Sequence, residues 1–148
     1  MNNVYDACRD FLKKYPMTVA WRVKQHAKLI QEHINEDEVP LYAFLGQKDT
    51  TIFQPIFTTA IVFTNKRMLM ASKKFFGRYY YTSITPDMLN DFQIRASFIY
   101  GEVEIDTVKE HFKISCLDKK SLPKIEDALS KYLLNEKLKL MKNKKDSK

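Results

Sequence analysis

The stretch Ile56–Lys74, IFTTAIVFTNKRMLMASKK, decides how this sequence folds. Two apolar runs flank the pair Asn65-Lys66, and asparagine tolerates the left-handed backbone that a type I′ turn requires. The stretch therefore predicts a β-hairpin with a two-residue turn, in which Phe63 lies opposite Met68. It carries no nucleophile, metal ligand or phosphate-binding loop, so it predicts a scaffold and names no chemistry.

Both faces of this predicted hairpin are apolar. Val62 and Leu69 point to one side, and the other side carries Ile61, Phe63, Met68 and Met70. Burying one such side chain stabilises a fold by about 1.5 to 3 kcal/mol, so the outer face needs a cover. We expect the amphipathic segments of the N-terminal region to provide it.

Length and composition predict one globular domain with short appendages. The chain has 148 residues, of which 45% are hydrophobic, enough for a core without disulfides or metals. Cys8 and Cys116 have no partner spacing, and neither a signal peptide nor a membrane-spanning apolar run is present. These features predict a cytoplasmic protein with reduced thiols.

The positive charge is concentrated at the C-terminal end. The net charge is +7, but residues 136–148 hold six lysines against Glu136 and Asp146 and so account for +4. The other 135 residues carry only +3, which argues against nucleic acid as the partner.

The first forty residues predict two helices. The first helix is expected to begin after a cap at Asn2 or Asn3 and to end at Pro16. Its apolar residues recur at helical spacing and are Val4, Ala7, Cys8, Phe11, Leu12 and Tyr15. A second stripe, with Thr18 as possible cap and Arg22 turned to water, comprises Ala20, Val23, Ala27, Ile30 and Ile34.

After Pro40 the apolar period changes to two, which indicates antiparallel strands. We expect seven of them, near residues 41–46, 55–64, 67–73, 78–84, 89–96, 100–107 and 110–116. The dry faces of the last two should carry Val103, Ile105, Phe112, Ile114 and Cys116. A closing helix, capped by Asp118 or Ser121, should bury Leu122, Ile125, Leu129, Tyr132 and Leu133.

This order of elements resembles a bacterial pleckstrin-homology-like (PH-like) domain of the YokE-like type. The residues that carry the resemblance, between Glu38 and Leu134, are Phe63-Thr64-Asn65-Lys66-Arg67-Met68-Leu69, Gly77-Arg78, Tyr81-Thr82-Ser83-Ile84, Leu89-Asn90-Asp91-Phe92 and Gly101-Glu102-Val103-Glu104-Ile105. Eukaryotic PH domains usually place a tryptophan in the closing helix, whereas the one tryptophan here is Trp21.

The expected fold class is α+β and mainly β: a PH-like barrel of about seven antiparallel strands, closed by a C-terminal α-helix and preceded by two N-terminal helices. We divide the chain into a helical pair (1–36), a PH-like domain (38–135) and a basic tail (136–148).

The resemblance implies a non-catalytic module for protein–protein interaction or self-assembly, with an exposed sheet edge or the closing-helix groove as the contact surface. Phosphoinositide recognition needs several cations in the first interstrand loop, since a phosphorylated headgroup takes several charge-assisted hydrogen bonds. In the loop Gly46–Thr51, Lys48 stands alone and Asp49 cancels its charge, which argues against that ligand.

One candidate contact site is the predicted turn with Lys73, Lys74, Phe75, Phe76 and Arg78. Two phenylalanines among three cations suit a membrane surface or a partner groove. The alternative, which we favour from sequence, is that both phenylalanines cap the barrel end. Tyr79, Tyr80 and Tyr81 pose the same choice between a stacking platform and a covered barrel wall.

A second candidate is the tail, whose cations are Lys137, Lys139, Lys142, Lys144 and Lys145, interleaved with the apolar stripe Leu134, Leu138 and Met141. This pattern fits weak, salt-sensitive contact with an anionic membrane, which is the alternative function. We favour the interpretation that these residues form a frayed helix end followed by a polar tail without a binding role.

An enzyme would need chemistry that no motif supplies. His26 and His33 are two helical turns apart, too far to share a metal, and His111 and Cys8 belong to no recognisable site. With three glycines in the chain, no phosphate-binding loop is expected either. We therefore predict no catalytic residue, no metal and no cofactor.

Overall fold

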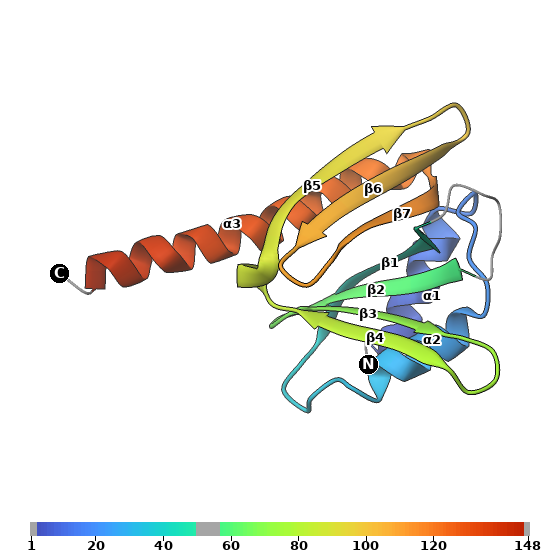
Figure 1. Cartoon of the computed structure of the whole chain (residues 1–148), viewed down its shortest axis with the longest axis horizontal. Helices are drawn as coiled ribbons and strands as arrows, with labels where there is room; N and C mark the ends of the chain where they lie inside the picture. Colours follow the sequence, from blue (N-terminus) through green and yellow to red (C-terminus); the bar gives the residue numbers. More distant parts are fainter. Residues whose placement is uncertain (1–2, 50–56, 147–148) are drawn as a thin grey trace.

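A computed structural model describes residues 3–49 and 57–146 of the chain, and for residues 135–146 it describes only the helical backbone. Two helices, α1 (Val4–Lys14) and α2 (Val23–Gln31), come first (Figure 1). The strands follow, namely β1 (Pro40–Lys48), β2 (Thr58–Thr64), β3 (Met68–Lys73), β4 (Tyr79–Ile84), β5 (Leu89–Ala96), β6 (Tyr100–Thr107) and β7 (His111–Asp118). Short 3₁₀ turns, η2 (Pro86–Met88) and η3 (Lys119–Ser121), precede β5 and the helix α3 (Leu122–Asp146).

The strands form one antiparallel sheet that curls into a half-barrel, in the order β4-β3-β2-β1-β7-β6-β5. The expected fold class is confirmed. The bounds of the second predicted strand differ, because β2 begins at Thr58 and residues 55 and 56 lie outside the described part of the chain.

The register of the central hairpin is confirmed, but its turn type is not. Phe63 pairs with Met68, and the Thr64 amide donates to the Arg67 carbonyl (2.9 Å). Neither residue of the Asn65-Lys66 pair has a positive φ, so the type I′ prediction is wrong. Instead, the Thr64 hydroxyl accepts hydrogen bonds from the amides of Lys66 and Arg67 (3.1 Å each), and a capped turn needs no left-handed residue.

Strands β1 and β7 join the two halves of the sheet over a very short distance. Within the described residues they pair only at Gln47 and Lys48. Just before, at Gly46, a β-carbon would come within 2.5 Å of Ile114 Cγ2 and 2.7 Å of the Ser115 carbonyl oxygen. Glycine permits this close approach. Over Pro40–Gly46, β1 has β2 on one side and no strand partner on the β7 side among the described residues.

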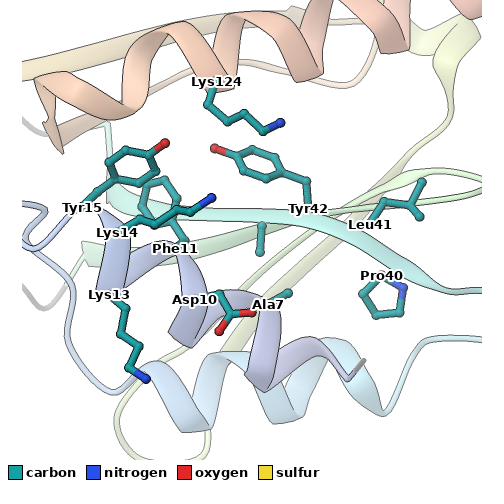
Figure 2. A pocket seen from close by; sticks show the side chains of 11 residues that line it. Ala7, Asp10, Phe11, Lys13, Lys14, Tyr15, Pro40, Leu41, Tyr42 and Lys124 are labelled. Carbon is teal, nitrogen blue, oxygen red and sulfur yellow. The ribbon is translucent and has the colours of Figure 1, made fainter. Parts of the chain in front are cut away.

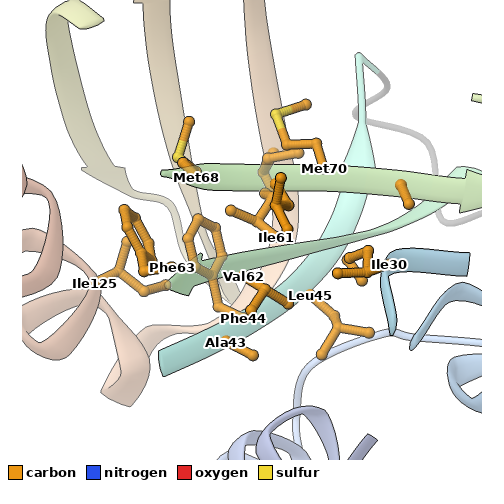
Figure 3. Close-up of a cluster of buried hydrophobic side chains, with 14 of the residues drawn as sticks. Ile30, Ala43, Phe44, Leu45, Ile61, Val62, Phe63, Met68, Met70 and Ile125 are labelled. Atoms are coloured by element: carbon orange, nitrogen blue, oxygen red, sulfur yellow. The ribbon is translucent and has the colours of Figure 1, made fainter. Parts of the chain in front are cut away.

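The N-terminal helices cover the outer face of the hairpin, as the apolar pattern predicts. Helix α1 packs on β1, and α2 packs on β2 and β3. In Figure 3, Ile30 reaches the core from α2 and Ile125 reaches it from α3. Every residue of β2 is buried, which explains why both of its faces are apolar.

The caps of the two helices differ from each other. Asn3 caps α1, accepting from the Asp6 amide (2.7 Å), while Asn2 lies outside the described residues. The predicted Thr18 cap of α2 is wrong: its hydroxyl accepts from the Asp118 amide (3.0 Å) and ties the interhelical loop to β7. Helix α2 begins instead after Arg22, whose φ is 55°.

The predicted buried faces of β6, β7 and α3 are confirmed, except that Leu133 of α3 is only half-buried. One irregularity appears at Cys116, whose φ of 59° marks a bulge where the β6–β7 register shifts between Gly101 and Val103. The bulge turns Leu117 inward as well, so the alternation expected from sequence breaks there.

The motif that carries the family resemblance clamps the linker between α2 and β1. Arg67 donates to both carboxylate oxygens of the buried Glu38, with Nη2–Oε1 at 2.7 Å and Nε–Oε2 at 3.1 Å. The Thr64 hydroxyl donates to Glu38 as well (2.8 Å), Asn65 accepts from the Val39 amide (2.8 Å), and Lys66 pairs with Asp37.

The ionisation of Glu38 depends on this clamp. Burial opposes the charge, but hydrogen bonds from Arg67, Thr64 and the Asn35 amide outweigh it and lower the pKa of Glu38. The Thr-Asn-Lys-Arg motif is therefore structural: it fixes the segment that leads from the helices into the sheet.

Helix α3 first packs against the half-barrel and then projects beyond it, away from the β3–β4 end of the molecule (Figure 1). Its packed part buries Ile125, Leu129 and Tyr132, and the Tyr132 hydroxyl donates to the Ile84 carbonyl (2.5 Å). No helix in the described part of the chain is long and apolar enough to cross a bilayer.

Candidate functional site

The turn between β3 and β4 exposes aromatic side chains at its tip. The Lys74 amide donates to the Arg78 carbonyl (2.8 Å), which closes the turn around Phe75, Phe76 and Gly77. Phe76 is 96% exposed and has a φ of 60°, a left-handed conformation that is costly for a bulky residue. A large apolar side chain is thus held in water at the end of a hairpin.

The corner before α2 forms the second wall of this site. The Trp21 ring lies 5.9 Å from the Phe75 ring, and the Arg22 guanidinium lies 4.8 Å from the centre of that ring. Arg22 also donates to the Lys73 carbonyl (3.3 Å). The expectation that Arg22 simply faces water is therefore wrong.

Buried His26 connects this corner to β3. Its Nδ1 accepts from the Lys73 amide (2.8 Å), so the proton resides on Nε2, which donates to the Trp21 carbonyl (3.0 Å). Burial is the main cause that lowers the pKa of His26 to about 4. The imidazole is therefore neutral near pH 7 and holds the two walls of the site in place.

The site gathers four cations around a small cavity of about 160 Å³. Its lining comprises Trp21, Arg22, His26, Phe57, Lys73, Lys74, Phe75 and Arg78. Within the described ranges none of its Lys or Arg residues makes a salt bridge. Burial, with the charges of Lys48 and Arg78, lowers the pKa of Lys74, as expected where cations crowd without a carboxylate. We call the residues that line this cavity, together with Phe76 at the tip of the same turn, the basic-aromatic site.

The structure separates the two groups of candidate residues found in the sequence. Lys73, Lys74, Phe75, Phe76 and Arg78 come together in the basic-aromatic site. The predicted tail residues lie on the projecting part of α3, at the opposite end of the molecule (Figure 1). The structure describes only the backbone of these residues, which are Lys137, Lys139, Lys142, Lys144 and Lys145.

The prediction that both phenylalanines cap the barrel end is wrong. Phe76 is almost fully exposed at the tip of the turn, and Phe75 is 45% exposed and lies against the Trp21 ring. Sequence reasoning missed Trp21 and Arg22, since they lie some fifty residues before the turn and no local pattern links them to it. Aromatic and cationic residue types on both sides were the only available signal.

The three tyrosines of β4 do not form a common platform. Tyr79 is exposed, Tyr81 stacks on His33 with ring centres 3.9 Å apart, and Tyr80 donates to Glu110 (2.7 Å). The covered-wall interpretation is correct for Tyr81, whose ring is covered by His33 just after α2; Tyr80 lies on the other side of β4, against Glu110 and Lys48.

The lysine of the first interstrand connection is neutralised. Lys48 lies in β1 and pairs with Asp49 (3.0 Å) and Glu110 (3.3 Å), while residues 50 and 51 fall outside the described ranges. The contact between Lys48 and Asp49 is the cancellation that the sequence predicts.

His111 and Glu104 are not among the residues that line the cavity of the basic-aromatic site. His111 is exposed and hydrogen-bonds to Glu104 (2.5 Å), which raises the pKa of the imidazole. In the described part of the chain no group of three or more His, Cys, Asp or Glu side chains is placed to hold a metal ion.

Two solved structures to which this chain is similar are proteins of Shewanella species. A pleckstrin homology domain from Shewanella amazonensis SB2B is 19% identical, with a TM-score of 0.51, covering 75% of this chain and 96% of that one. A DUF1696 family protein with a pleckstrin-homology domain from Shewanella loihica PV-4 is 16% identical, with a TM-score of 0.44, covering 74% and 95%. No curated protein matches the chain.

The sequence profile described as "Bacterial PH domain" matches residues 34–131, which include the whole sheet and the first ten residues of α3 but neither α1 nor α2. This match covers most of the chain and agrees with the observed half-barrel and closing helix. The YokE-like type and the domain division at residues 36 and 135 stay predictions. The chain belongs to the bacterial PH domain family.

Proposed function

We propose that this chain is a non-catalytic binding module that docks on an anionic membrane surface through the basic-aromatic site. The observation that carries the proposal is Phe76, which stands 96% exposed at the tip of the turn, among cations that lack carboxylate partners in the described structure. An aromatic tip enters the interface between headgroups and acyl chains, and lysines and arginines beside it contact lipid phosphates.

A second apolar tip supports a planar target. Phe98, 94% exposed, and Ile99 form the β5–β6 turn, and this turn projects from the same end of the molecule as the β3–β4 turn (Figure 1). Lys119 donates to the Phe98 carbonyl (3.0 Å), which places a cation beside this tip too. Two separate tips with cations at one end suit a surface better than a compact ligand.

The test is co-sedimentation of the full chain with phosphatidylcholine vesicles, with and without phosphatidylglycerol, at low and high salt. We expect binding only to the anionic vesicles and its loss at high salt. The double variant Lys74→Gln, Arg78→Gln should bind roughly thirtyfold more weakly, since each removed charge is worth about 1 kcal/mol.

Matched controls separate the site from general charge and apolarity. Val108→Ser changes an exposed apolar residue in the β6–β7 turn, and Lys131→Gln removes an exposed lysine on α3; both should bind like the unmodified chain. Truncation after Asn135 removes the tail and should also leave binding intact. Loss of binding on truncation, with the site variants unaffected, would assign the function to the tail instead.

A protein partner or self-assembly is the second candidate, and it is favoured by the outer edge of β5, which pairs with no strand in the described part of the chain. Strand β5 ends the sheet, and its side chains are mostly exposed. At the other end of the sheet Lys109 already donates to the Ser83 carbonyl of β4 (2.7 Å), which hinders strand addition there. Light scattering that shows a dimer for the unmodified chain and a monomer for the β5 variant Gln93→Pro would support this candidate.

A further inference from the structure

A second and larger cavity lies where the two halves of the sheet separate. It has a volume of about 470 Å³, within the range of small-molecule sites. Its floor is the part of β1 that has no partner on the β7 side, and α1 and α3 form its walls (Figure 2). We call it the α1–α3 cavity.

One side of this cavity is apolar and aromatic. The Phe11 ring packs near the rings of Tyr15 (5.0 Å between centres) and Tyr42 (6.4 Å), and Leu41 and Pro40 extend the wall along β1. Leu41 is exposed although it lines the cavity, so an apolar body bound there would cover it.

The other side is polar and positively charged. Lys14 of α1 and Lys124 of α3 reach over the cavity, and neither makes a salt bridge within the described ranges (Figure 2). The cavity lining holds three lysines, with Lys13 as the third, against the single carboxylate of Asp10. The net charge of the lining therefore favours an anion.

The Tyr42 hydroxyl is the strongest indication that this cavity binds a ligand. Its oxygen is buried, yet it has no hydrogen-bond partner among the described residues. A buried hydroxyl without a partner costs about 1 to 3 kcal/mol, so such groups are usually satisfied by a bound molecule or water. In Figure 2 the hydroxyls of Tyr42 and Tyr15 point toward one another, below Lys124.

We propose that the α1–α3 cavity binds a small amphipathic anion, with its carboxylate or phosphate head between Lys14, Lys124 and the Tyr42 hydroxyl, and its apolar body along Phe11 and Leu41. Charge-assisted hydrogen bonds from lysines and a tyrosine hydroxyl would hold the head. Helix α1 supplies half of the site and lies outside the residues matched by the family profile, so the site depends on a part of this chain beyond the PH-like barrel.

Isothermal titration calorimetry of the full chain tests this inference with four probes: octanoate, octyl phosphate, octanol and inorganic phosphate. We expect saturable one-to-one binding of at least one of the two amphipathic anions. Octanol lacks the charged head and phosphate lacks the apolar body, so each should bind at least about tenfold more weakly. Comparison of octanoate with octyl phosphate tells which head the site prefers.

Two variants locate the binding. Tyr42→Phe and Lys124→Gln should each weaken the preferred anion about fivefold or more, whereas Lys131→Gln, an exposed lysine further along α3, should leave it unchanged. Tyr42→Phe should not lower the urea midpoint of unfolding, because the hydroxyl has no protein partner to lose.

Phe76→Ser keeps this test independent of membrane docking, since it alters the basic-aromatic site alone and should bind the anion like the unmodified chain. The inference is overturned if neither anion binds better than octanol, if both cavity variants retain full affinity, or if Tyr42→Phe lowers stability.

Discussion

The two ends of strand β3 look alike in sequence and differ in structure. Lys66-Arg67 precedes the strand and Lys73-Lys74 closes it. At the first end the cations pair with Asp37 and Glu38, which the linker after α2 delivers. At the second end the described structure supplies no carboxylate, and Phe76 stands in water. The ion pairs at the first end stabilise the fold, whereas the cations at the second end, which have no carboxylate partner in the described structure, can bind an anionic ligand.

The sharpest test of this contrast removes one cation from each end. Arg67→Met leaves the Glu38 carboxylate buried without its partner and should lower the free energy of unfolding by about 3 kcal/mol. Arg78→Met should change it by less than about 0.5 kcal/mol, as usual for an exposed residue without a partner. Urea denaturation measures both; equal losses would abolish the distinction.

The buried histidine behind the second end should make stability depend on pH. His26 has a folded pKa of about 4, below the unfolded value near 6.5, so the unfolded state binds more protons between these values. Stability is therefore complete above about pH 6.5 and falls by about 2 kcal/mol or more as the pH approaches 4. Unfolding of the unmodified chain and of His26→Gln at several pH values should show the loss only in the former.

Exposed His111 is the control for that experiment. Its pKa is raised by hydrogen bonding to Glu104, so its contribution has the opposite sign: it is present at low pH and lost as the pH rises. If His111→Gln, and not His26→Gln, removes the acid-induced loss, the assignment to His26 is wrong.

The first end of β3 should respond to stronger acid. The lowered pKa of Glu38 means that its contribution is present above its unfolded pKa, about 4.3, and is lost as the pH falls through the folded value. The stability difference between the unmodified chain and Glu38→Gln, measured by urea unfolding, should be about 1 to 2 kcal/mol at pH 6 and shrink toward pH 3. A constant difference would contradict the ionic role of Glu38.

The smallest expected effect separates stability from binding at Phe76. Asparagine adopts a positive φ more readily than phenylalanine, so Phe76→Asn should raise the free energy of unfolding by about 0.5 kcal/mol. The same change should weaken binding to anionic vesicles, because it removes the apolar tip. A variant that loses stability instead would show that Phe76 packs in the fold, as the capping interpretation held.

Several local details could not be read from the sequence, each for a physical reason. The apolar pattern predicts the hairpin correctly, but not its turn type. The Thr64 hydroxyl accepts hydrogen bonds from the turn amides, so the turn does not need a type I′ backbone. Thr18 was a reasonable cap by residue type, yet the Asp118 amide, a hundred residues away, takes its hydroxyl. The capping role of Phe75 and Phe76 failed because solvent exposure of a turn depends on what packs beside it.

The order of two helices, seven strands and a closing helix follows from the amino-acid sequence alone, because periods of 3.6 and 2 in the apolar residues reflect local backbone geometry. The same apolar pattern also predicts that the central hairpin is buried on both faces. Tertiary contacts set the rest: which cations are neutralised, that Trp21 and Arg22 join the β3–β4 turn, and that the lysine tail lies at the other end. They also place Lys124 of α3 opposite α1 at the cavity beside Tyr42. These features depend on contacts between residues far apart in the chain, which no local pattern encodes.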